Sequence, residues 1–189
     1  MTRADARDAL TVNVAALLAE PVGSVRDLVF DGVELDLGED LQAAGPARAR
    51  VRLTRTNRGL LVDGDVLATL AETCSRCLRP IEVTVEPEFE EEALQSVELT
   101  TGTPIDHADE PEVARLTDHH EIELEPFVRE AIQLAAPIAP LCRPDCPGLC
   151  PVCGEELTDG PHDHPDEAVD PRLEALRAFR VDEGDSSDS

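Results

Sequence analysis

The chain of 189 residues carries 16 basic residues, all of them Arg, against 41 acids, which gives a formal net charge of −25. Such a charge repels phosphate, so it argues against broad electrostatic binding to nucleic acid or to an anionic membrane and favours a basic protein partner. The length suits one ordinary domain, or one domain with a small appended module. Because Trp and Tyr are absent, the core must be aliphatic, and a structural metal would help to hold it.

Neither a secretory signal nor a membrane span is expected. The N-terminal apolar stretch is interrupted by Asp8 and Asn13, and no apolar run approaches the length of a membrane helix. Six cysteines without a signal point to a reducing cytoplasm, in which Cys-x-x-Cys pairs act as metal ligands rather than as disulfides.

The first 45 residues carry weak patterns. Residues 12–19 are compatible with a short helix before Pro21 and Gly23. Residues 29–37 are compatible with a strand that turns at Asp31-Gly32.

From Ala47 onward the alternation of apolar and polar residues is clear. Residues 47–54 alternate Ala, Val and Leu with Arg and Thr, which is typical of a half-buried strand. Turns are expected at residues 57–59 and at Asp63-Gly64-Asp65, with a short strand between them.

Alternation continues over residues 66–70 and 81–89, on either side of Cys74 and Cys77. This Cys pair is therefore predicted at the tip of an antiparallel hairpin. Together the segments predict an α+β fold, with an antiparallel β-meander or partly open barrel that has one solvated face.

The acidic residues 86–125 resemble a partly ordered linker, with a short helix possible over residues 90–99. The clearest helix follows. Its apolar residues recur at helical spacing, Pro126 suits its first turn, and it is predicted to pack on the sheet before Pro137 ends it. Those apolar residues are Leu124, Phe127, Val128, Ala131, Ile132 and Ala135.

Near the C-terminus, Asp170 and Pro171 suit the start of another short helix, over residues 170–179. The domain organisation predicted from these patterns has three parts. Residues 1–140 form a β-rich core with the Cys-x-x-Cys hairpin, the acidic stretch and the amphipathic helix. Residues 141–181 form a Cys/His zinc-binding segment with the short helix, and residues 182–189 form a disordered acidic tail.

The cysteines carry the chemistry of the chain. Four of the six lie in residues 141–154, which read Leu-Cys-Arg-Pro-Asp-Cys-Pro-Gly-Leu-Cys-Pro-Val-Cys-Gly, and the other two form a Cys-Ser-Arg-Cys motif. Thiolates are soft ligands that suit a tetrahedral zinc cage. The candidate metal ligands are Cys74, Cys77, Cys142, Cys146, Cys150, Cys153, His162 and His164.

Several arrangements of one or two zinc ions are open, among them a pairing of Cys74 and Cys77 with Cys150 and Cys153, but two arrangements are considered in detail and the first of these is favoured. In the first, one ion is held by Cys74, Cys77, Cys142 and Cys146, and a second by Cys150, Cys153, His162 and His164. In the second, Cys142, Cys146, Cys150 and Cys153 hold one ion, which leaves the hairpin pair free or weakly metallated.

The metal is expected to be structural, because Cys-rich cages are usually closed to substrate. His-Glu-x-x-His, a Gly-rich phosphate loop and Gly-x-Ser-x-Gly are all absent from the sequence, so no catalytic residue is assigned. A zinc-dependent hydrolase or nuclease remains the alternative. His119 and His120 are expected at the surface, and His107 has no candidate partner.

Seven Arg gather in residues 48–79, in a chain that is otherwise acidic. An RNA contact through them is possible, with Arg48, Arg50, Arg52, Arg76 and Arg79 as candidates. The favoured interpretation is that they pair with acids on the same face of the sheet, because no aromatic residue is available there to stack a base. The acids expected to pair with them are Glu82, Glu86 and Glu88.

These motifs together resemble the YceD family of large ribosomal RNA subunit accumulation proteins, in its actinobacterial form. The resemblance rests on Cys74-Ser-Arg-Cys77-Leu78, the acidic strand, the helix that runs into a Pro-rich segment, and the block over residues 141–154. It extends from about residue 20 to Asp170-Pro171-Arg172. Relatives with Cys-x-Cys in place of His162-Asp163-His164 favour the two-ion arrangement, whereas others lack the last Cys pair.

The resemblance implies a cytoplasmic, non-enzymatic factor in the synthesis or processing of large-subunit (23S) ribosomal RNA. With the charge of the chain, it makes a basic ribosomal protein or a pre-large-subunit particle the expected partner. No small-molecule substrate and no membrane partner are expected.

Overall fold

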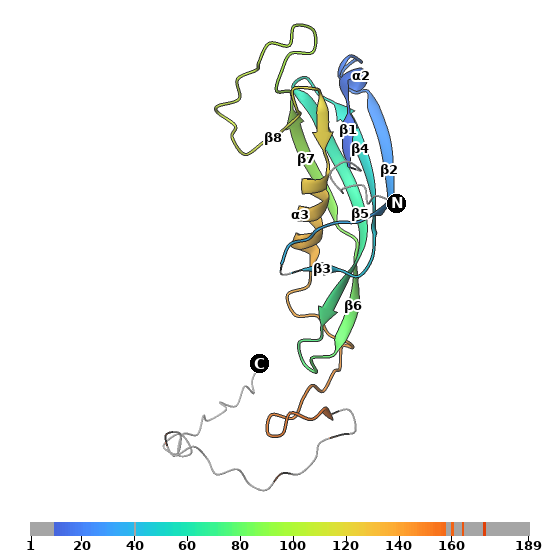
Figure 1. Cartoon of the computed structure of the whole chain (residues 1–189), viewed down its shortest axis with the longest axis vertical. Coiled ribbons are helices and arrows are strands. Elements are labelled where there is room, and N and C mark those ends of the chain that lie inside the picture. The colour runs from blue at the N-terminus through green and yellow to red at the C-terminus, as the bar shows by residue number, and fades with distance from the viewer. Residues whose placement is uncertain (1–9, 40, 158–159, 161–163, 165–171, 173–189) are drawn as a thin grey trace, which may run out of the picture. The chain divides into compact units, whose positions relative to one another are not determined.

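The structure, a computed structural model, describes residues 10–39, 41–157, 160, 164 and 172. It divides into two compact units, Met1–Cys146 and Pro147–Ser189. All the helices and strands named below belong to the first unit (Figure 1). The predicted tail over residues 182–189 lies outside the described residues, as does the predicted helix over residues 170–179 apart from Arg172. The limits predicted for the zinc-binding segment stay predictions.

A seven-stranded sheet forms the body of the first unit. Its strand order is β2-β4-β5-β7-β8, with β3 and β6 paired to β5 beside this path. The strands are β2 (Val25–Val33), β3 (Gln42–Ala43), β4 (Ala47–Arg55), β5 (Gly59–Thr73), β6 (Pro80–Val85), β7 (Glu88–Leu94) and β8 (Ala114–Arg115). Every pairing is antiparallel except that of β7 with β8. Among the described residues β8 does not pair back to β2, so the predicted α+β class is confirmed as an open sheet.

A smaller sheet joins β1 (Thr11–Asn13) to β9 (Glu121–Glu123). Helix α2 (Ala15–Leu18) follows β1 directly. The helix predicted over residues 12–19 is therefore wrong in its first part, because β-branched side chains there favour a strand and find a partner more than a hundred residues later.

Strand β2 runs through the turn predicted at Asp31-Gly32. The register between β2 and β4 shifts between Asp31 and Val33, which makes this position a β-bulge. Gly32 accommodates the bulge with a φ of 73°. The predicted turn is therefore wrong, although the glycine that suggested it does mark an irregularity.

The core lies on one face of the sheet, where helix α3 (Glu125–Ala135) covers β5 and β7 (Figure 1). Strand β4 buries Ala47, Ala49, Val51 and Leu53 and exposes the Arg residues between them, as its alternation predicts. Helix α3 starts at Glu125, next to Pro126, and buries Val128, Ala131 and Ile132, so the predicted helix and its packing on the sheet are confirmed, although Ala135 at the end of the predicted stripe is exposed. Phe127 of α3 stacks on Phe89 of β7 with 6.3 Å between ring centroids.

The hairpin turn predicted at Asp63-Gly64-Asp65 is wrong, because β5 continues through it for 15 residues. Gly64 lies opposite Phe89 in the neighbouring strand. A Cβ atom at Gly64 would overlap the Phe89 ring, so this glycine makes room for a side chain from another strand rather than for a turn.

The linker and short helix predicted within residues 86–125 are wrong at their start, because residues 88–94 form β7, which pairs with β5 over seven positions. Ala93 and Leu94 are fully buried there. Glu is a good helix former, but strand pairing and burial of the two apolar residues override that preference. The loop that follows is fastened by an Arg58–Glu110 ion pair.

The antiparallel pair β5–β6 is confirmed, and the Cys74–Cys77 turn joins its two strands. The pairing ends at Thr73 and Pro80, directly beside this turn. Within the described residues, no helix is long and apolar enough to cross a membrane.

Candidate metal centre

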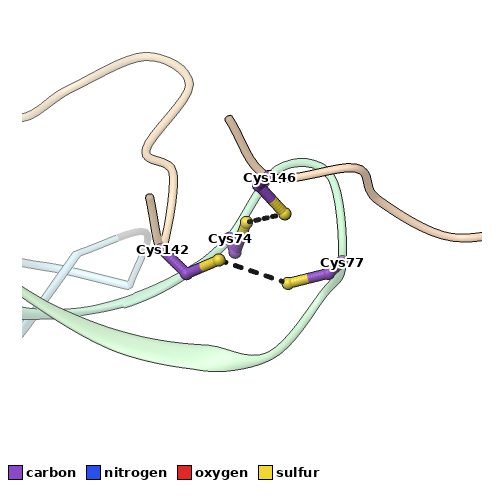
Figure 2. Close-up of side chains that lie close together, drawn as sticks. All are labelled: Cys74, Cys77, Cys142 and Cys146. Atoms are coloured by element: carbon purple, nitrogen blue, oxygen red, sulfur yellow. Dashed lines mark hydrogen bonds between the residues drawn. The ribbon is translucent and has the colours of Figure 1, made fainter. Parts of the chain in front are cut away.

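The tip of the β5–β6 hairpin is a tight turn that holds two cysteines. The backbone N–H of Cys74 donates to the carbonyl oxygen of Arg79 at 2.9 Å, and the N–H of Leu78 donates to the carbonyl oxygen of Cys74 at 2.9 Å. Leu78 takes a left-handed φ of 60°, which is rare for a residue with a Cβ atom. This geometry brings both sulfurs to the same side of the turn, as Figure 2 shows.

The segment after helix α3 lies against this tip. The N–H and the side-chain hydroxyl of Ser75 both donate to the carbonyl oxygen of Pro140, at 2.8 and 3.1 Å. The guanidinium of Arg76 donates to the carbonyl oxygen of Cys146 at 2.9 Å. These contacts place Cys142 and Cys146 beside the first Cys pair, although about seventy residues separate the two pairs.

The four sulfurs of Cys74, Cys77, Cys142 and Cys146 all lie within 4.8 Å of one another. The Sγ atoms of Cys74 and Cys146 are 3.8 Å apart, and those of Cys77 and Cys142 are 3.7 Å apart (Figure 2). A tetrahedron with Zn–S distances of about 2.3 Å has S···S edges of about 3.8 Å. A disulfide needs about 2.05 Å, and all six cysteines are free, so these donors fit a tetrahedral metal ion.

Hydrogen bonding and burial shift the pKa values of two of these thiols in opposite directions. Cys74, Cys77 and Cys146 are buried, and Cys142 is half-buried. The backbone N–H of Cys77 lowers the pKa of Cys74 to about 6, whereas burial, with the neighbouring sulfurs, raises the pKa of Cys142 to about 12. Four crowded thiols cannot all ionise without a compensating positive charge, so a bound cation is what this donor set needs to become fully anionic.

A second cluster lies in the unit Pro147–Ser189, where ligand atoms of Cys150, Cys153 and His164 lie within 4.8 Å of one another. The Sγ atom of Cys150 is 3.1 Å from the Nε2 atom of His164. The pKa of Cys150 is lowered to about 6, chiefly by the backbone N–H of Cys153. His162, the fourth ligand expected here, lies outside the described residues.

The two Cys-x-x-Cys turns share one backbone geometry. At the second turn the N–H of Cys150 donates to the carbonyl oxygen of Glu155, and the N–H of Gly154 donates to that of Cys150, in the same pattern as at the first. Gly154 has a φ of 76°, and Leu78 at the equivalent position has a φ of 60°. Both turns are therefore the same structural unit, with glycine in one and a conformationally strained leucine in the other.

The grouping of cysteines is the one required by the first arrangement considered from the sequence. It groups Cys142 and Cys146 with Cys74 and Cys77, whereas the second arrangement would place them around one ion with Cys150 and Cys153. Sequence reasoning missed two contributors to the first cluster, namely the Ser75–Pro140 contact and the conformation of Leu78. The other histidines lie elsewhere: the ring of His107 bonds to the carbonyl oxygen of Gln95 at 2.7 Å, and His119 is exposed.

Three of the Arg residues of strand β4 pair with acids, whereas Arg55 at its end donates to the backbone carbonyl oxygens of Leu18, Thr56 and Gly59. The ion pairs are Arg48–Asp31 at 2.9 Å, Arg50–Asp65 at 3.2 Å and Arg52–Asp27 at 2.7 Å. The expectation of pairing within the sheet is thus right in kind, but the expected partners Glu82, Glu86 and Glu88 are wrong. Strands β2 and β5 flank β4 and supply the Asp residues, whereas the expected Glu residues lie on or beside β6 and β7, which are not its neighbours.

Comparison with known proteins identifies the family. A family model described as large ribosomal RNA subunit accumulation protein YceD matches residues 62–180, more than half of the chain, and the chain therefore belongs to the YceD family. Uncharacterized proteins of Mycobacterium bovis and Mycobacterium tuberculosis are 37% identical to it over 136 residues, which are 72% of this chain and 63% of theirs. A Mycobacterium leprae protein is 30% identical over 148 residues, 78% of this chain and 64% of its own length. The chain thus matches less than two thirds of each of these relatives, and no solved structure matches it.

Proposed function

We propose that this member of the YceD family is a zinc-stabilised, non-enzymatic binding factor that supports the accumulation of large-subunit (23S) ribosomal RNA. The observation that carries the proposal is the cluster of Cys74, Cys77, Cys142 and Cys146, whose sulfurs have the spacing of a tetrahedral zinc cage. The family description supplies the connection to large-subunit ribosomal RNA.

The first ion would be structural. All four of its donors are thiolates, and a cage closed by four cysteines leaves no open position for a water nucleophile or a substrate. When bound, zinc compensates the charge of the four sulfurs and joins the tip of the β5–β6 hairpin to the segment that follows helix α3. The second ion would be held within the other unit by Cys150, Cys153 and His164, with His162 as its fourth ligand.

The proposed activity is binding, in the reducing cytoplasm that keeps the cysteines free. A formal charge of −25 makes a basic ribosomal protein, or a ribonucleoprotein particle that displays one, the better partner. Direct contact with bare RNA is less well supported, because Arg48, Arg50 and Arg52 each already pair with an Asp.

Metal content tests the first part of the proposal. The purified protein should contain two zinc ions per chain. The double variant Cys74→Ser/Cys77→Ser should lose one of them, and His162→Ala/His164→Ala should lose the other. Wild-type protein that binds no zinc after reconstitution under reducing conditions would refute the proposed metal centres.

Sedimentation tests the second part. The wild-type protein should sediment with precursors of the large ribosomal subunit, and Cys74→Ser/Cys77→Ser should reduce that association. Ser75→Ala, which leaves all eight candidate ligands in place, is the matched control and should retain it. Cleavage of RNA that a chelator abolishes would instead identify a metal-dependent nuclease and contradict the proposal.

A further inference from the structure

The face of the sheet opposite helix α3 carries a shallow groove. It has a volume of about 850 Å³ and crosses strands β2, β4, β5 and β7. The charged residues that line it are Asp27, Arg50, Arg52, Asp63, Asp65, Glu88 and Glu90. Five carboxylates against two guanidiniums leave a net charge of −3 on this groove.

The two guanidiniums neutralise two of the five carboxylates, one on β2 and one on β5. Arg52 pairs with Asp27, and Arg50 pairs with Asp65. Within residues 10–39 and 41–157, no ion pair involves Glu88 or Glu90, and both side chains are exposed. The unbalanced negative charge is therefore concentrated on the side of β5 and β7.

Strand register arranges four of these carboxylates in a regular array. Asp63 lies opposite Glu90, and Asp65 lies opposite Glu88. Positions i and i+2 of one strand are about 6.5–7 Å apart, and paired positions on neighbouring antiparallel strands are about 4.5–5.5 Å apart. Two carboxylate pairs thus lie side by side at the spacing of alternate residues in an extended chain.

We infer that this carboxylate array (Asp63, Asp65, Glu88 and Glu90) is the docking site for an extended polypeptide segment with arginine at alternate positions. Such a segment, laid along β5 and β7, places one guanidinium at Asp63 and Glu90 and the next at Glu88, whose strand partner Asp65 already pairs with Arg50. Charge-assisted hydrogen bonds would stabilise both contacts. The exposed aliphatic side chain of Val29 in the same groove offers a surface for the stem of a long basic side chain. The inference rests on the proposed function, for which it names the partner-binding surface.

Peptide binding tests the inference without any ribosomal material, so its failure is distinct from a failure of the proposed function. The probe is a fluorescein-labelled peptide in which arginine alternates with threonine, and binding is followed by fluorescence anisotropy at low salt. A second peptide of the same composition, with its arginines adjacent, reports on the spacing. The wild-type protein should bind the alternating peptide more tightly, and the affinity should fall as salt is added.

The triple variant Asp63→Asn/Glu88→Gln/Glu90→Gln should weaken binding at least tenfold. The matched control Glu20→Gln/Glu112→Gln/Glu123→Gln removes the same charge from exposed positions outside the groove and should change the affinity less than twofold. Glu90→Lys, a single reversal at an exposed site, should also abolish binding, which gives a second measurement if the triple variant does not fold.

Several results would overturn the inference. Equal losses in the array and control variants would show that bulk charge alone attracts the peptide. Equal affinity for the two peptides would show that no extended register is recognised, and an absence of binding would remove the site. Binding of single-stranded RNA to this face, displaced by the peptide, would assign the groove to nucleic acid instead.

Discussion

Removal of the first metal ion should release the segment after helix α3 while the sheet stays folded. The protein contacts that hold residues 138–146 to the hairpin tip include two hydrogen bonds to Pro140 and one to Cys146. At about 1 kcal/mol net each, they contribute about 3 kcal/mol. Ordering these nine backbone residues costs about 9–18 kcal/mol, so these hydrogen bonds do not suffice without the metal.

Zinc changes that balance. Structural zinc sites of this ligand type contribute about 10–16 kcal/mol, which matches the cost of ordering the segment. The sheet does not depend on the metal ion, because a buried aliphatic core stabilises it. This core includes Leu53, Leu60 and Val62 and contains none of the candidate metal ligands. Loss of the ion should therefore open the segment locally rather than unfold the unit.

Hydrogen–deuterium exchange read by mass spectrometry measures this directly. Zinc removal by a chelator, or by Cys142→Ser, should deprotect the amides of Ser75 and Cys146 and leave those of β4 and β5 protected. Ser75→Ala, which removes one hydrogen bond, should keep the ion and the protection. Unchanged protection of Cys146 in the metal-free protein would refute the reasoning, as would cooperative loss of the whole sheet.

Three further substitutions test particular packing arguments. Leu78→Gly should raise the free energy of unfolding by about 0.5–1 kcal/mol, measured by denaturation of the zinc-loaded protein, because glycine relieves the left-handed backbone. Gly59→Ala should destabilise the fold by about 2–4 kcal/mol, because a Cβ atom there overlaps the carbonyl oxygen of Ala93, whereas Gly45→Ala in open space should stay within about 0.5 kcal/mol. Arg52→Gln should leave the denaturation midpoint nearly unchanged, because its ion pair with Asp27 is exposed to solvent, and should leave affinity for an RNA oligonucleotide unchanged.

The candidate ligands were predictable because their signal is local. A Cys-x-x-Cys turn places two sulfurs near one ion whatever the surrounding fold, and both turns have the same backbone geometry. Which Cys pairs share one metal ion cannot be predicted from local sequence, because it depends on how the chain between Cys77 and Cys142 folds. The hydrogen bonds to the carbonyl oxygen of Pro140 could not be predicted either, because every residue has a backbone carbonyl. The left-handed conformation of Leu78 could not be predicted because leucine rarely adopts it.

The strands and helices likewise include some that local sequence predicts and some that depend on distant contacts. Strand β4 was predictable because its period-2 pattern needs only one buried face, and helix α3 because its apolar stripe follows the helical period. The errors at Gly64 and over residues 88–94 share a cause. Each residue type was interpreted by its local preference, glycine for a turn and Glu for a helix or linker, whereas contacts from a strand some 25 residues away determine the conformation.

The long strand β5 contributes residues to the carboxylate array and leads into the metal centre, and its length sets the distance between these two regions. Its middle carries Asp63 and Asp65 of the carboxylate array, and its end runs into Cys74 of the metal centre. At about 3.3 Å per residue, Asp65 and Cys74 lie about 30 Å apart along the strand.

Because that distance exceeds the range of direct contact and the Debye length at physiological salt, removal of zinc should leave peptide binding by the array unchanged. Anisotropy titrations of the Cys74→Ser/Cys77→Ser variant with the alternating peptide test this, with the zinc-loaded wild type as reference. An unchanged dissociation constant, together with weaker association with large-subunit precursors, would mean that the metal end makes its own contact with the particle. A tenfold loss of peptide affinity would instead show that the ion maintains the whole sheet face, and would contradict the local role assigned to the metal centre.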